Sequence, residues 1–85
     1  MQCSIEISLH PLRDAYLAPI DAFLDALRAA PGIEIDVNDM STHIHGDYEV
    51  VMAVLVAELR RSLEAHPGIF VLKILGIDTR LPHGR

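Results

Sequence analysis

The stretch Ile33-Glu-Ile-Asp-Val-Asn-Asp-Met-Ser-Thr-His-Ile-His45 decides the fold, because it holds two short runs that alternate between apolar and polar residues. In 33–38 the two isoleucines and Val37 point to one side, and the acidic residues point to the other. A period of two predicts a half-buried strand. Asn38-Asp39 is typical of a turn, and residues 41–45 alternate again. The stretch therefore predicts a β-hairpin.

Two more strands and two helices flank this hairpin. Residues 2–10 alternate strictly, and Pro11 ends that strand because proline lacks an amide hydrogen. Apolar residues spaced three and four apart predict one helix over 14–30 and a second that opens at Gly46-Asp47. A Pro-Gly pair stops each helix. Residues 69–75 then form the last predicted strand.

The predicted order βαββαβ is that of the ferredoxin-like, split-βαβ fold. Right-handed crossovers place the first strand beside the third in the middle of a four-stranded antiparallel sheet. The fourth strand then lies outside the first, and the second outside the third. We expect an α+β sandwich with two helices on one face, the face that bears Ile5, Ile7 and Ile35. One domain over 1–78 and a flexible tail over 79–85 complete the prediction.

Composition excludes several classes of function. The chain has 85 residues and a formal charge of −5, without a basic stripe, so we expect no nucleic-acid partner. No apolar run reaches the roughly 20 residues that a membrane span needs, so we expect no membrane partner. The single cysteine, Cys3, cannot form an internal disulfide, and we expect no signal peptide, because Met1 leads almost directly into a strand pattern. We therefore expect a cytoplasmic protein, and we expect its thin core to favour homo-oligomers.

The sheet face without helices is where a function is expected. Glu6 should lie at its centre among serine and histidine side chains, with Lys73 nearby. A carboxylate in such a place pairs with a cationic or protonated heterocycle by charge-assisted hydrogen bonds. Two other interpretations stay open: an ordinary solvated sheet face, and a face covered by a second sheet in an oligomer through Ile69 and Val71.

Catalysis and metal binding have weaker support. His43-x-His45 can chelate a metal ion, with Glu6 or His10 completing the set, but this spacing is common by chance. Cys3 lies on the same side of its predicted strand as the apolar residues Ile5 and Ile7. We therefore expect it in the core rather than as a nucleophile. No glycine-rich phosphate loop appears. We expect no enzyme activity and no cofactor, and a metal site at His43 and His45 remains an alternative.

Two segments carry a family resemblance: Cys3-Ser-Ile-Glu-Ile-Ser-Leu-His-Pro-Leu12 and Asn38-Asp-Met-Ser-Thr-His-Ile-His-Gly-Asp-Tyr48. Together they resemble the YkoF-like thiamine/hydroxymethylpyrimidine-binding family. Its members carry a strand that ends in Ser-Leu-Tyr-Pro-Leu or -Met, and a Met-Ser-Thr…Gly strand that leads into the second helix. The resemblance runs over 3–78, nearly the whole chain. His10 departs from it, because the family usually has tyrosine there.

This resemblance implies a ferredoxin-like domain that forms homodimers or homotetramers and holds thiamine or its hydroxymethylpyrimidine moiety without transforming it. The resemblance places Ser8 and His10 on the first motif, and Met40, Ser41 and Thr42 on the second. Combined with the open face, it predicts these ligand-binding residues: Glu6, Ser8, His10, Asn38, Met40, Ser41, Thr42 and His43. Thr42 alternates toward the core, so a structural role is open for it. A regulatory or structural oligomerisation module without a small-molecule ligand is the alternative function.

Overall fold

The computed structural model describes residues 1–12, 15, 17–38 and 41–80. Six elements follow one another along the chain in the predicted order. They are β1 (Gln2–Pro11), α1 (Leu17–Ala29), β2 (Ile33–Val37), β3 (Thr42–Asp47), α2 (Tyr48–Ala65) and β4 (Gly68–Leu75). This order confirms the predicted ferredoxin-like α+β fold.

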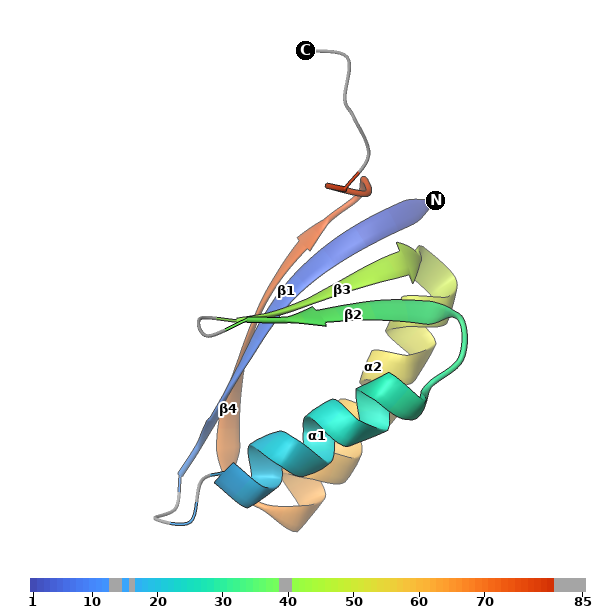
Figure 1. Cartoon of the computed structure of the whole chain (residues 1–85). Helices are drawn as coiled ribbons and strands as arrows, with labels where there is room; N and C mark the ends of the chain where they lie inside the picture. The colour runs from blue at the N-terminus through green and yellow to red at the C-terminus, as the bar shows by residue number, and fades with distance from the viewer. Residues whose placement is uncertain (13–14, 16, 39–40, 81–85) are drawn as a thin grey trace.

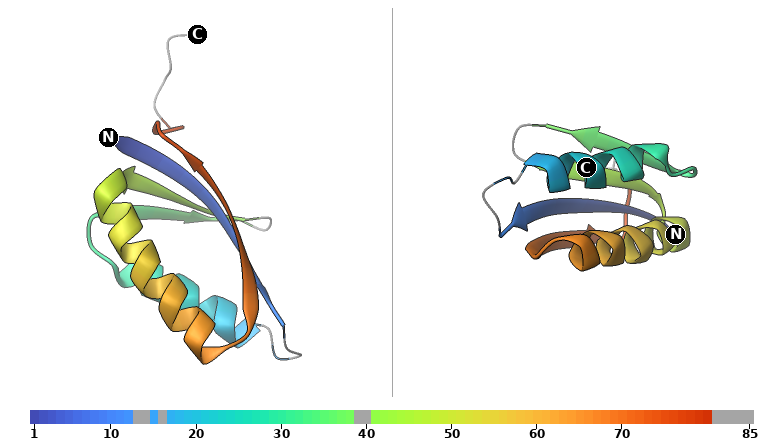
Figure 2. Two further views of the ribbon diagram at one scale, coloured as in Figure 1. Left: turned by 180° about the vertical axis from the view of Figure 1, so that it is seen from behind. Right: turned by 90° about the horizontal axis from the view of Figure 1, so that it is seen from below.

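The four strands form one antiparallel sheet in the order β2-β3-β1-β4. The strand order is the one that right-handed crossovers require. Both helices lie side by side on one face of the sheet and leave the other face without a helix (Figures 1 and 2). Neither helix is long and apolar enough, within the described residues, to cross a membrane.

The core lies between the sheet and the two helices. Its fully or almost fully buried side chains come from β1, β3 and both helices: Cys3, Ile5, Ile7, Phe23, Leu27, Ile44, Val51 and Leu55. The β1 members alternate along the strand, which confirms that the period of two marks the helix-covered face. Burial raises the pKa of the Cys3 thiol, which fits a core residue better than a nucleophile.

Element boundaries differ from the sequence prediction by up to three residues, and the largest shifts are at the start of the first helix and the end of β3. The first helix begins at Leu17 rather than at residue 14. Asp14 and Tyr16, which the predicted range includes, lie outside the described residues. β3 continues to Asp47 because its last residues pair with the start of β1. Asp47 stands at the N-cap of α2 but makes no capping hydrogen bond. Its carboxylate instead lies 3.5 Å from the amino group of Met1.

Gly32 forms the turn between α1 and β2. Its φ angle is +83°, a left-handed conformation that side chains other than glycine rarely adopt. A Cβ atom at this position would lie 3.0 Å from Cγ1 of Val50. The turn therefore needs glycine for both its backbone conformation and its space.

Candidate functional site

Four polar side chains form a row across the helix-free face, one from each strand. The register pairs Glu6 of β1 with His43 of β3 on one side and with Lys73 of β4 on the other. Asp36 of β2 follows next to His43. The Glu6 carboxylate lies 3.4 Å from His43 Nε2 and 3.5 Å from Lys73 Nζ. Glu6 therefore occupies the centre of this face, as the alternation of β1 predicts.

A hollow of about 230 Å³ opens beside this row, and we call it the Glu6 hollow. The Glu6 side chain is 42% exposed, so its carboxylate is within reach of a small molecule in the hollow. The lining residues come from the three strands β1, β3 and β4 and from the segment after β4: Ser4, Ile5, Glu6, His43, His45, Lys73, Leu75 and Thr79.

A second hollow, of about 310 Å³, lies further along β1, and we call it the Ser8 hollow. It forms because pairing between β1 and β3 ends at Ile7 and Thr42, while β1 continues to Pro11. Side chains of α1 close the gap from behind. The lining residues are Ile7, Ser8, Leu9, His10, Ile20, Phe23, Leu24, Val37, Asn38, Ser41 and Thr42.

The structure divides the predicted ligand-binding residues between these two hollows. Glu6 and His43 line the first. The second is lined by Ser8, His10, Asn38, Ser41 and Thr42. Met40 lies outside the described residues. The described members of the predicted set thus border two hollows, and Ser41 of the second contacts His43 of the first.

The β2–β3 turn orients the His43 ring. The Asn38 side-chain oxygen accepts a hydrogen bond from the Ser41 amide at 2.9 Å, a local bond that is common at asparagine turns. The Ser41 hydroxyl then lies 3.0 Å from His43 Nε2, the same nitrogen that faces Glu6. Thr42 is buried, in agreement with its alternation toward the core.

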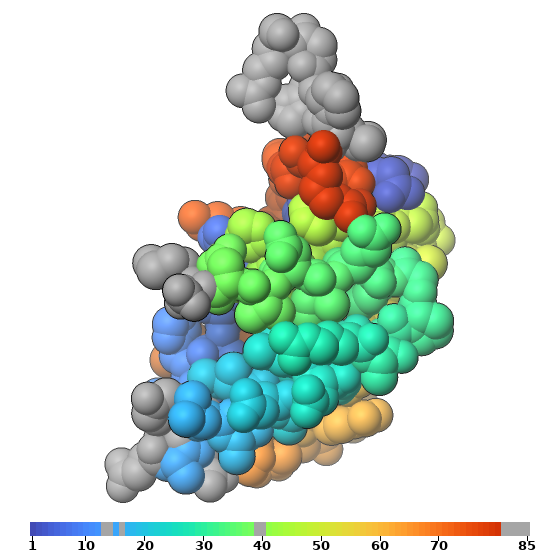
Figure 3. Space-filling view, in the orientation of Figure 1, coloured from blue at the N-terminus to red at the C-terminus, as the bar shows by residue number. Residues whose placement is uncertain are grey.

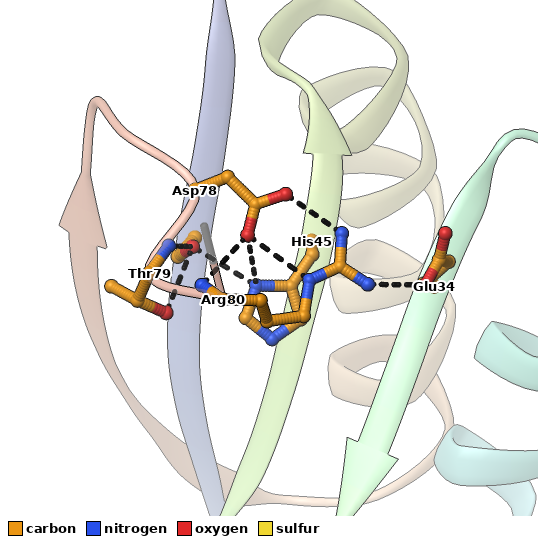
Figure 4. A network of polar contacts seen from close by, with 6 residues as sticks. Glu34, His45, Asp78, Thr79 and Arg80 are labelled. Carbon is orange, nitrogen blue, oxygen red and sulfur yellow. Dashed lines mark hydrogen bonds and ion pairs between the residues drawn. The ribbon is translucent and has the colours of Figure 1, made fainter. Parts of the chain in front are cut away.

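The alternation in 41–45 predicts an exposed side chain for His45, but the structure buries it. Only 4% of its surface is exposed, because the chain after β4 folds over it (Figure 4). Its Nδ1 atom lies 2.9 Å from the Ser4 hydroxyl and 3.7 Å from the Asp78 carboxylate. Burial and the nearby Arg80 lower the pKa of His45.

These contacts weaken the metal alternative at His43 and His45. The ring of His45 is buried with Nδ1 at hydrogen-bond distance from Ser4, and His10 lines the other hollow. Among the described residues, no group of three or more His, Cys, Asp or Glu side chains is arranged to hold a metal ion.

Sequence reasoning missed the segment that follows β4. Asp78 is 8% exposed, and the Thr79 amide donates a hydrogen bond to the Ser4 hydroxyl at 2.9 Å. Arg80 bonds to Asp78 and pairs with Glu34 of β2. No periodic pattern marks these residues, because they follow a strand and belong to no regular element. The assignment of 79–85 to a flexible tail stays a prediction, since 81–85 lie outside the described residues.

Comparison with known proteins supports the fold. No protein-family model and no curated protein matches the chain. A crystal structure from Streptococcus pneumoniae matches with a TM-score of 0.83 and 20% identity over 94% of this chain and 91% of the other. A proposed thiamine biosynthesis/salvage protein from Thermotoga maritima matches with a TM-score of 0.77 and 16% identity, over 87% and 82%. A domain of unknown function, DUF77, from Bacillus cereus matches with a TM-score of 0.74 and 17% identity, over 93% and 79%.

Proposed function

We propose that this chain binds a cationic, nitrogen-rich heterocycle of the thiamine type on its helix-free face, without transforming it. The observation that carries the proposal is the position of Glu6. Its carboxylate is half-exposed at the centre of the sheet, borders a hollow, and has only a histidine and an exposed lysine as ionic partners among the described residues. A fold shared with the Thermotoga maritima protein is consistent with this proposal.

The chemistry of thiamine complements these groups. Its thiazolium ring carries a permanent positive charge, and its aminopyrimidine ring can be protonated. Glu6 accepts charge-assisted hydrogen bonds from the aminopyrimidine or attracts the thiazolium. A ligand that binds in this way displaces Lys73, whose side chain is 80% exposed and holds Glu6 at 3.5 Å. Such an exposed ion pair costs little to break.

The size of the hollows bears on how much of the ligand they hold. Typical ligand pockets measure roughly 300–1,000 Å³, so the Glu6 hollow, at about 230 Å³, suits one ring better than two. Glu6 and Ser8 are neighbours on the same face of β1, about 6.6 Å apart along the strand. A molecule with two linked rings therefore has room to reach from the Glu6 hollow into the Ser8 hollow. Hydroxymethylpyrimidine alone needs only one of them.

Isothermal titration calorimetry of thiamine and hydroxymethylpyrimidine tests the proposal. We expect saturable binding by the unmodified protein. Glu6→Gln keeps the shape and removes the charge, so affinity should fall about 10- to 100-fold, as expected for one hydrogen bond to a charged group. Glu49→Gln removes an equivalent charge from α2, on the other side of the sheet, and should bind normally. Absence of heat with both compounds, or equal affinity in Glu6→Gln, would contradict the proposal.

A second candidate function is oligomerisation without a small-molecule ligand. It is favoured by the apolar residues of β4 that share the helix-free face. Ile69 and Val71 are each about half exposed, and so is Leu75 at the edge of the Glu6 hollow. A second sheet placed on this face would cover them. Ligand binding and oligomerisation are compatible if a second copy closes the Glu6 hollow over the ligand. If a second copy fills the hollow instead, the titration above will show no binding of either compound.

A further inference from the structure

Residues 76–80, which we call the C-terminal strap, turn back over one end of the helix-free face. Figure 3 shows this segment, in red, seated against the ends of the strands. Arg80 donates to both carboxylate oxygens of the buried Asp78, at 3.0 and 2.8 Å. The same guanidinium pairs with Glu34 of β2. Arg80 thus connects the strap to the strand at the far edge of the sheet, and its hydrogen bonds lower the pKa of Asp78 to about 2.

Thr79 is the strap residue that reaches the candidate site. Its amide donates a hydrogen bond to the Ser4 hydroxyl at 2.9 Å, and its own hydroxyl lies 3.3 Å from the same oxygen. Both Ser4 and Thr79 line the Glu6 hollow. One end of the hollow is therefore built by the strap and not by the sheet.

The Ser4 hydroxyl connects this contact to His45. A serine hydroxyl has one hydrogen to donate and two lone pairs to accept with. Because the Thr79 amide and the Thr79 hydroxyl both donate to the Ser4 oxygen, they occupy its two lone pairs, and the single hydrogen of Ser4 is directed to His45 Nδ1, at 2.9 Å. This arrangement needs a neutral His45 with its proton on Nε2. A proton on Nδ1 would make His45 a competing donor to Ser4 and weaken the contact with Thr79.

We propose that the C-terminal strap is part of the ligand site, with Thr79 as the end wall of the Glu6 hollow and Arg80 as the positioning residue that holds it there. The proposal rests on the ligand-binding function proposed above. It assigns a role in binding to two residues that follow the last strand of the sheet.

The strap should also respond to pH through His45. The charged and titratable groups around this ring come from the strap and from all four strands: Asp78, Arg80, Glu34, Asp36, His43, Asp47, Glu6 and Lys73. Burial is the main cause that lowers the pKa of His45, and the Arg80 charge adds to it. Protonation below about pH 6.5 then works against the Ser4–Thr79 contact. A ligand site that depends on the strap should therefore lose affinity as the pH falls through this range.

Two measurements on Arg80→Ala test the proposal. In NMR hydrogen exchange, the Thr79 amide should exchange about 3- to 10-fold faster than in the unmodified protein, as for the loss of about one hydrogen bond. In calorimetry, Arg80→Ala should bind thiamine or hydroxymethylpyrimidine about 3- to 10-fold more weakly than the unmodified protein. Its affinity should also fall less between pH 7.5 and 5.5 than that of the unmodified protein, because the strap is already released. Arg80→Lys should recover part of both effects. Arg60→Ala removes an exposed arginine on α2 and serves as the matched control.

The outcomes separate this proposal from the function on which it rests. If the unmodified protein binds and Arg80→Ala binds equally, with the same pH profile, the strap is not part of the site, even where the Thr79 amide exchanges faster. If the Thr79 amide is unchanged in Arg80→Ala, Arg80 does not position it. If the unmodified protein binds neither compound, the proposed function fails and the ligand role of the strap fails with it, while hydrogen exchange still reports whether Arg80 holds Thr79.

Discussion

A single imidazole, that of His45, connects the middle of the sheet to the chain that follows β4. It is buried, so the neutral ring is favoured and its pKa lies below the ordinary value for histidine. In the unfolded chain the same ring has the ordinary pKa of about 6.5. Folding is therefore coupled to the protonation state of this one side chain.

The coupling predicts how stability depends on pH. Below about pH 6.5 the unfolded state binds a proton at His45 that the folded state binds less well, so the free energy of unfolding falls as the pH is lowered through the folded pKa. The loss should reach at most about 1.4 kcal/mol for each pH unit. Urea unfolding between pH 7.5 and 5 measures it.

Two variants check that His45 causes this slope. His45→Asn should flatten it, whereas the exposed His10→Asn should keep it. The depressed pKa of Asp78, about 2, acts in the same direction but only below about pH 4, where that carboxylate takes up its proton. An unchanged slope in His45→Asn would show that another group is responsible.

At the scale of single elements, β1 organises the molecule. It pairs with β3 on one side and β4 on the other, and its alternate residues enter the core or line the hollows. This is the part that sequence reasoning predicts best, because a strand covered on one face leaves a period of two in its residues. The face on which Glu6 lies and the burial of Cys3 follow from that period, and the direction of Thr42 follows from the same period in β3.

The turn before β2 gives an element-scale prediction. Gly32→Ala forces a Cβ into a left-handed backbone conformation and against Val50, so it should lower the free energy of unfolding by about 1–2 kcal/mol. Gly76→Ala is the matched control, since its Cβ meets only Met1 Sδ at 3.4 Å, an ordinary contact. Chemical denaturation compares the two variants. Equal stability of both would mean that the turn relaxes without cost.

The remaining features depend on contacts that periodicity does not encode. The strap reaches Ser4 from 75 residues away in the sequence, and its residues show no alternation that marks them as buried. The division of the predicted site into two hollows depends on where the pairing of β1 with β3 ends. That endpoint is a property of the twisted sheet as a whole. Composition and motif spacing carry no signal for either feature.

At the scale of the whole molecule, one edge of the sheet presents apolar surface on the helix-free face. We expect a homodimer or homotetramer in which Ile69 and Val71 of β4 are covered by a second copy. Val71→Lys places a charge in this contact and should shift the protein toward the monomer in sedimentation velocity. Val56→Lys changes a more exposed valine on α2 and should leave the assembly unchanged. A monomeric unmodified protein, or an assembly that tolerates Val71→Lys, would exclude this interface.

The row of Asp36, His43, Glu6 and Lys73 has a consequence for electroneutrality. With a neutral imidazole, its two carboxylates and one ammonium leave a single negative charge that runs across all four strands. A monovalent organic cation cancels that charge, whereas a ligand with an additional phosphate group would bring a surplus of the same sign. We therefore expect this face to bind free thiamine more tightly than its phosphate esters, independently of their shape.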